Sequence, residues 1–322
     1  MSARAGGECR LEGEACPAPT PYGSAESHFP GPILLTMLSF ALALLLAGNT
    51  IPGLHQQGVQ FYKEQKYADA ITALQESVRT EDPASPDYKE SVLLIGQSYF
   101  MLKQAPKAIP WLEKVTHVNE ANYMLGYAYL QTKQPDQSEA AFARLFNVSA
   151  NSASAHLLAG EMMLKQEYEP EAVLEVKKAL AIDPKLPQAH FLLAEVAIHR
   201  GRLDEAIGDL EHELAINSGF SMAWYRLGDA YCRQENWTAA IPNLQRAVWL
   251  NPDFSGPYIL LGKCYFKTAN YSNAEGILKR ALLLDPRNYS ATYLLGQTLM
   301  NEDKKDEGRQ VLEKLKTLRQ TP

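Results

Sequence analysis

The chain has few cysteines, four among 322 residues. They form no paired CxxC arrangement of the kind that binds zinc or exchanges disulfides. The sequence also lacks a phosphate-binding loop, an HExxH metal-binding helix and a nucleophile elbow. These absences predict that the chain is not an enzyme, and that it has no catalytic residues, no cofactor and no metal ion.

Positive charge is not in excess either. Lysine and arginine number 31 against 37 acidic residues, which gives a net charge of −6, and no basic stripe is visible. This balance argues against nucleic acid as the main partner. The composition is otherwise that of a globular chain, with 46% apolar and 9% aromatic residues, enough to fill an all-helical core.

A repeat dominates the chain from residue 51 onward. Eight segments align at one small residue, which is followed by an aromatic or large apolar residue; the small residues are Gly58, Gly96, Gly126, Gly160, Ala194, Gly228, Gly262 and Gly296. Their spacings are 38, 30 and then 34 residues five times. A period of 34 is typical of stacked helix–turn–helix units.

The clearest unit spans residues 221–254 and has bulky, small and proline residues in a fixed order: Trp224, Leu227, Gly228, Tyr231, Ala240, Leu244, Ala247 and Pro252. This order resembles the tetratricopeptide repeat motif, with leucine in place of phenylalanine. The resemblance covers about residues 51–322. It implies an all-α, right-handed superhelical solenoid of about eight units, near 51–88, 89–118, 119–152, 153–186, 187–220, 221–254, 255–288 and 289–322.

The spacing within a unit has a physical basis that is independent of the family. Trp224, Leu227 and Tyr231 share one face of a first helix. Gly228 and Ala240 are small where the first and second helices of a unit are expected to cross. Proline in the second helices, at Pro110 and Pro242, predicts slight kinks rather than breaks.

The first fifty residues differ from the repeats. Residues 1–32 are rich in Gly, Pro, Ser, Ala and Glu, which predicts a disordered tail. Residues 33–47 contain no charge, so residues 33–50 are predicted to be a signal peptide, or a membrane anchor if the apolar run extends to Ile51; a buried helix is the third alternative. The residues before this run are acidic, whereas a signal peptide normally begins with basic residues. Translation that starts at Met37 would explain the difference, because the acidic residues would then not be translated.

These N-terminal features predict a location outside the cytoplasm. The chain is expected to be exported, to the periplasm or beyond, or to be anchored to a membrane through residues 33–51. The flanking charges are too weak to assign an orientation.

The resemblance to tetratricopeptide repeats implies that first helices line a concave groove. The residues expected there are aromatic or charged, and they are predicted to bind peptide or helical segments of partner proteins: Tyr123, Tyr127, Glu161, Phe191, Glu195, Tyr225, Asp229, Lys263 and Tyr293. A competing interpretation is that some of these side chains pack in the core. The three acidic residues also precede Lys165, His199 and Arg233 by four positions, which favours pairs within a helix.

Two further residue pairs leave alternatives open. His156 and His190 occupy equivalent positions in successive units, which predicts a packing or rim role, because no third metal ligand is evident. Cys232 and Cys264 lie in adjacent units and are predicted to be buried thiols, with a disulfide as the alternative.

The repeats therefore predict an interaction scaffold or adaptor. The alternatives are a self-assembling structural subunit of an envelope complex and the recruitment module of a hydrolase. The partner and the oligomeric state are left open by the sequence.

Overall fold

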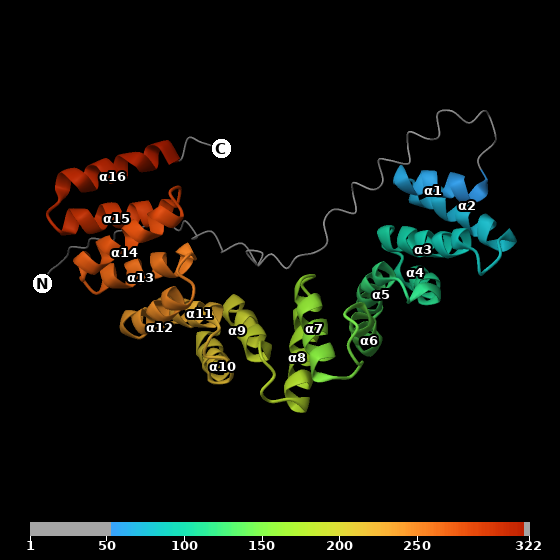
Figure 1. Ribbon diagram of the computed structural model, residues 1–322, viewed down its shortest axis with the longest axis horizontal. Helices are drawn as coiled ribbons and strands as arrows, with labels where there is room; N and C mark the ends of the chain where they lie inside the picture. Colours follow the sequence, from blue (N-terminus) through green and yellow to red (C-terminus); the bar gives the residue numbers. More distant parts are fainter. Residues whose placement is uncertain (1–52, 319–322) are drawn as a thin grey trace, which may run out of the picture. The chain divides into compact units, whose positions relative to one another are not determined.

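The computed structural model describes residues 53–318, which form sixteen α-helices and one 3-10 helix and, within that range, no strand (Figure 1). The predicted tail, signal or anchor segment and alternative start all lie outside the described residues. No helix between residues 53 and 318 combines the length and the hydropathy that crossing a membrane would require.

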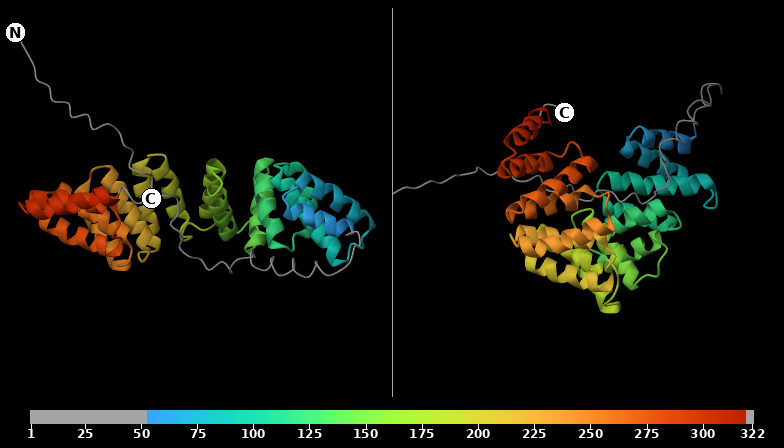
Figure 2. Two further views of the ribbon diagram at one scale, coloured as in Figure 1. Left: turned by 90° about the horizontal axis from the view of Figure 1, so that it is seen from above. Right: turned by 60° about the vertical axis from the view of Figure 1, so that its left-hand side comes forward.

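The helices form eight successive antiparallel hairpins, each pairing a first helix with a second: α1 (Leu54–Lys63) with α2 (Tyr67–Thr80), α3 (Pro86–Met101) with α4 (Ala105–Leu112) and the 3-10 helix η2 (Glu113–Val115), α5 (Asn119–Gln131) with α6 (Pro135–Leu145), α7 (Ala153–Leu164) with α8 (Glu169–Ile182), α9 (Ala189–His199) with α10 (Leu203–Ile216), α11 (Ser221–Arg233) with α12 (Trp237–Leu250), α13 (Ser255–Lys267) with α14 (Tyr271–Leu284), and α15 (Tyr289–Asn301) with α16 (Lys305–Leu318). Each second helix also packs on the first helix of the next hairpin (Figures 1 and 2). The prediction of an all-α helical repeat solenoid is confirmed.

The small residue of each unit lies where the two helices of a hairpin cross. A Cβ atom added to Gly228 would lie 2.5 Å from Cγ of Leu244, and one added to Gly262 would lie 2.6 Å from Cγ of Leu278. Every glycine of the series faces the residue sixteen positions later in the same way. Only the fifth hairpin has alanine, Ala194, at this place. Close helix contact therefore explains the repeated glycine.

The turn inside every hairpin contains one residue with left-handed backbone angles. It lies seven positions after the small residue, with φ between 57° and 71°: Gln65, Lys103, Lys133, Glu167, Gly201, Glu235, Ala269 and Asp303. In the sixth hairpin the N–H groups of Glu235 and Asn236 donate to the carbonyls of Cys232 and Tyr231. These bonds satisfy carbonyl groups that the helix end leaves unpaired.

Two irregularities have local explanations. The 30-residue spacing is accommodated by α4, which has eight residues and continues as η2, whereas α12 has fourteen. Pro110 lies inside α4 and Pro242 inside α12, and both helices continue beyond the proline.

Glu213, where the fourth, sixth and seventh units have alanine, is fully buried. Its carboxylate accepts from the backbone N–H of Gln188 at 2.8 Å and from that of Phe191 at 3.4 Å. Gln188 itself has left-handed angles, with φ of 73°. The carboxylate thus stabilises the start of α9. The first N–H groups of a helix otherwise have no hydrogen-bond partner within the helix.

Candidate functional site

The aromatic residues predicted to line the groove divide into exposed and buried ones. Tyr123 and Tyr293 are 40% and 45% exposed, and Tyr225 is half-buried. Tyr127 and Phe191 are 4% and 9% exposed and belong to the core. The expected exposure of these two residues is therefore corrected: their rings fill the contact between hairpins, where Phe191 meets Phe220 with ring centroids 4.8 Å apart.

Tyr123 lies at the rim of a pocket of about 200 Å³. The lining combines four aromatic rings with two amide side chains, from Phe100, Tyr123, Tyr127, Gln131, Gln166 and Tyr168. The rings of Tyr123 and Tyr127 meet edge to face at 4.9 Å. The hydroxyl of Tyr127 donates to the carbonyl of Met162 at 3.2 Å, and burial raises the pKa of this phenol, which keeps it neutral. The pocket is thus an open hollow in which aromatic rings and polar side chains lie together.

A second pocket, of about 290 Å³, was not predicted from the sequence. It is lined by polar residues of η2, α5 and α6 and the bend between them: Glu113, Thr116, Tyr129, Gln137, Ala140 and Arg144. The Tyr129 hydroxyl donates to Oε1 of Glu113 at 2.5 Å, and burial together with this carboxylate raises the pKa of Tyr129 to about 12. These residues fall at different repeat positions, so no sequence period could have united them.

The three acidic residues of the predicted groove have different partners. Asp229 accepts from Nε of Arg233 at 3.0 Å, which confirms one pair within a helix. Glu195 pairs instead with Arg226 of the next hairpin, whose Nη2 donates to Oε2 at 2.9 Å. The expected pair of Glu195 with His199 is therefore wrong. The guanidinium group of Arg226 offers two nitrogens to the carboxylate, and it does so from the next hairpin.

Glu161 has no short ionic contact among the described residues, and Lys165 acts on it only at longer range. Burial raises the pKa of Glu161, and it also raises the pKa of Glu195. Glu161 is therefore a half-buried carboxyl without a fixed basic partner.

The remaining predicted groove residues engage in aromatic contacts. Tyr225 meets Phe254 edge to face, with centroids 5.0 Å apart, and burial raises the pKa of its hydroxyl. The ammonium group of Lys263 lies 5.5 Å from the centre of the Trp237 ring. Such cation–π contacts stabilise by about 0.5–1 kcal/mol at exposed sites.

Cys232 and Cys264 lie side by side in the core between α11 and α13. Both are buried, and their Sγ atoms are 3.1 Å apart as free thiols. The prediction of two packed thiols is consistent with this burial.

Several solved structures are similar to parts of this chain. YrrB, described as a TPR protein with an unusual peptide-binding site, is 21% identical with a TM-score of 0.51, and the match covers 56% of this chain and 93% of YrrB. PilF of Pseudomonas aeruginosa is 19% identical with a TM-score of 0.50, covering 63% and 93%. MamA is 23% identical with a TM-score of 0.48, covering 50% and 94%. The likeness to YrrB and PilF, both under 25% identical, establishes a shared fold alone.

Sequence comparison gives a more specific result. No curated protein sequence matches the chain. A family model described as anaphase-promoting complex, cyclosome, subunit 3 matches residues 250–315. Tetratricopeptide repeat models match residues 55–117, 123–187, 187–221 and 223–258. With more than half of its length matched by these models, the chain belongs to the tetratricopeptide repeat family.

Proposed function

We propose that this interaction scaffold acts as an adaptor that holds a peptide or helical segment of a partner protein against its first helices. The pocket beside Tyr123 is the anchor site, and Tyr225 and Tyr293 extend the contact. The observation that supports this proposal most directly is the aromatic pocket with two amide groups at its edge.

The chemistry of the pocket fits a peptide. Its rings offer apolar area to one side chain of the segment, and the amides of Gln131 and Gln166 can donate to and accept from a peptide backbone. Four of its six lining residues belong to helices α3 and α5, so binding would order few protein groups and retain more of the contact energy. Glu161, a carboxyl without a fixed basic partner, favours a segment that also contains lysine or arginine.

Exposure of large aromatic residues gives a second reason. Tyr123 and Tyr293 are exposed, whereas Leu125 and Leu295, two positions later in the same helices, are buried. Tyrosine is enriched at protein interfaces because it combines apolar area with one hydroxyl group.

The test compares two sets of exposed residues on the same scaffold. The full chain with Tyr123→Ala, Tyr225→Ala and Tyr293→Ala is used in affinity capture with crosslinking, and crosslinked peptides are identified by mass spectrometry. A matched control replaces Trp249 and Leu283 by alanine; these residues are 69% and 72% exposed on the second helices α12 and α14.

The expected result is loss of crosslinked partner segments in the tyrosine variant and their retention in the control. Equal capture by the tyrosine variant and the wild-type chain would contradict the proposal. Light scattering on the same proteins separates an adaptor from a self-assembling structural subunit, because only self-assembly gives a mass that rises with protein concentration.

We also propose that the chain works outside the cytoplasm or at a membrane, on the strength of the uncharged run at residues 33–47. Cell fractionation of the full chain, compared with a variant that has Leu42→Arg and Leu45→Arg in this run, tests the idea. The charged residues are expected to leave the protein in the cytoplasm; an unchanged distribution would contradict it.

A further inference from the structure

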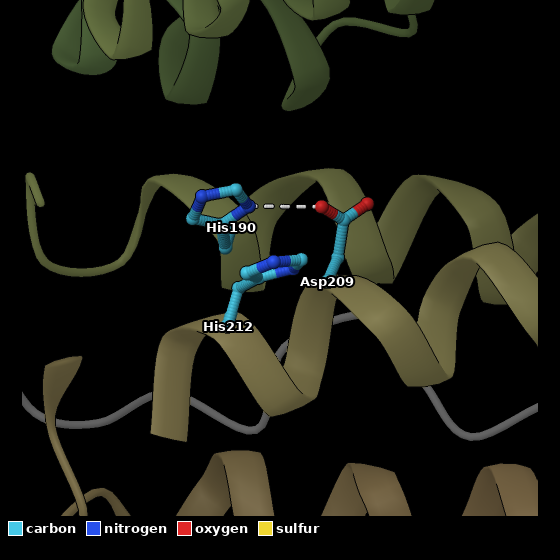
Figure 3. Close-up of side chains that lie close together, drawn as sticks. All are labelled: His190, Asp209 and His212. Carbon is cyan, nitrogen blue, oxygen red and sulfur yellow. Dashed lines mark hydrogen bonds and ion pairs between the residues drawn. The ribbon is translucent and has the colours of Figure 1, made fainter. Parts of the chain in front are cut away.

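Three side chains that can ligate a metal converge in the fifth hairpin. His190 comes from the first turn of α9, and Asp209 and His212 come from α10 (Figure 3). One nitrogen or oxygen atom of each lies within 4.8 Å of the others. Asp209 and His212 share a face of α10 because they are three positions apart. The sequence had indicated His190 but no third ligand; the missing ligands come from the second helix of the same hairpin.

The hydrogen bonds around these side chains orient them. Nδ1 of His190 lies 2.9 Å from Oδ1 of Asp209. Nδ1 of His212 donates to the carbonyl of Gly208 at 2.8 Å, so Nε2 of His212 has the lone pair. Metal-ligating histidines usually donate their other N–H to a carbonyl or carboxylate, as His212 does to Gly208. The two imidazole rings stack with centroids 5.0 Å apart (Figure 3).

The preceding hairpin provides an internal comparison. His156, Glu175 and Lys178 occupy the same repeat positions there, 34 residues earlier in each case. Nδ1 of His156 lies 2.6 Å from Oε2 of Glu175, and the Lys178 ammonium donates to Oε1 at 2.8 Å. The fourth hairpin thus has a lysine at this position, whereas the fifth hairpin has a histidine, a side chain that can ligate a metal.

We propose that His190, Asp209 and His212 bind a divalent transition metal ion, with zinc as the best match and water as the fourth ligand. Two nitrogen ligands and one carboxylate suit zinc, and three protein ligands with an open position are common for this ion. Ligand atoms of a tetrahedral zinc site are about 3.3 Å apart, given bonds of about 2.0–2.1 Å.

The 2.9 Å separation of His190 and Asp209 is already near that value. His212 is exposed, so no core packing opposes a rotation of its ring toward the other two ligands, although that rotation would disturb its stacking on His190. The metal would join α9 to α10 and thereby stabilise the hairpin that contains the exceptional Ala194.

Isothermal titration of the untagged full chain with zinc chloride tests the site. The key variant is His212→Lys, which installs the residue that the fourth hairpin has at this position and removes the imidazole ligand. Asp209→Asn is a second variant, and His117→Lys, an exposed histidine on another hairpin, is the control.

The expected result is that His212→Lys and Asp209→Asn each lose one equivalent of zinc or bind it at least ten-fold more weakly, while His117→Lys matches the wild-type chain. Zinc should raise the melting temperature of the wild-type chain and of His117→Lys more than that of the two ligand variants. Equal zinc affinity and stoichiometry in wild type and His212→Lys, with both proteins folded by circular dichroism, would overturn the proposal.

Discussion

The fourth and fifth hairpins differ from the sixth and seventh in how they use one repeat position. In the sixth and seventh this position is aromatic: Nε1 of Trp224 donates to the carbonyl of Ser218, and the Tyr258 hydroxyl donates to that of Pro252. In the fourth and fifth it is histidine, paired with a carboxylate nineteen residues later on the second helix. The same fold is therefore compatible with an aromatic residue or with a histidine–carboxylate contact, which is buried in the fourth hairpin and partly exposed in the fifth.

This difference has an energetic consequence. Truncating an aromatic side chain lowers the stability of the fold gradually, because its packing energy is spread over many weak contacts. A buried carboxylate depends on few partners, and removing one leaves a charge without compensation. The fourth and fifth hairpins should therefore be more sensitive to polar substitutions than the two that follow.

The largest effect is expected for His156→Ala. Glu175 is fully buried, and this substitution removes one of its two close partners, leaving Lys178. Removing a partner from a buried ion pair costs about 3–5 kcal/mol, and we expect about 3 because Lys178 stays. Urea unfolding followed by circular dichroism measures the change. His190→Ala, whose pair with Asp209 is partly exposed, should cost no more than about 1 kcal/mol; equal losses would contradict the difference in burial.

Glu213→Ala should have the next largest effect. Alanine is the residue that the sixth hairpin has here, at Ala247, so a consensus argument would predict stabilisation. The structure predicts a loss of about 2 kcal/mol, because the N–H of Gln188 would lose its partner. Glu213→Gln keeps one acceptor oxygen and should lose less. A more stable Glu213→Ala variant would show that the entry into α9 does not depend on the carboxylate.

The repeat period was enough to predict the helical hairpins, because Gly228 and its equivalents are required wherever two helices touch. The turns could not be predicted in the same way. Seven of the eight left-handed turn positions have a residue other than glycine, so the side chains at these positions show no preference for the conformation that the helix-end hydrogen bonds accompany. The pairing of Glu195 with Arg226 was missed for a related reason: the partner lies in the next hairpin.

The candidate site was predicted only in part. The repeat register identified Tyr123, Tyr225 and Tyr293, since equivalent positions of a repeat share a face. It could not separate the exposed Tyr123 from the buried Tyr127, because burial depends on the neighbouring hairpin. The pocket beside Tyr123 includes Gln166 and Tyr168 from the turn between α7 and α8, where the sequence has no recognisable pattern.

The helix crossing allows a reciprocal test of the comparison. Gly228→Ala should cost about 1–2 kcal/mol, because the new Cβ would overlap Cγ of Leu244 and force the helices apart. In the fifth hairpin Ala194 and Leu210 already share one core cluster, so Ala194→Gly relieves no overlap and should destabilise by the intrinsic helix cost of glycine, about 1 kcal/mol. If Gly228→Ala left the urea midpoint unchanged or raised it, close contact would not explain the glycine.

The smallest expected effect concerns the turns, and its sign is opposite. Glu235 has φ of 57° where the fifth hairpin has Gly201 with φ of 71°. Glycine adopts these angles without steric cost, so Glu235→Gly should stabilise the sixth hairpin by about 0.5–1 kcal/mol, after the larger entropy of glycine in the unfolded chain is subtracted. Gly201→Ala should destabilise the fifth hairpin by a similar amount, measured by the same urea unfolding. If neither substitution changed the stability, the turns would not distinguish the fifth hairpin from the sixth. Any difference in stability between these hairpins would then come from the buried polar contacts alone.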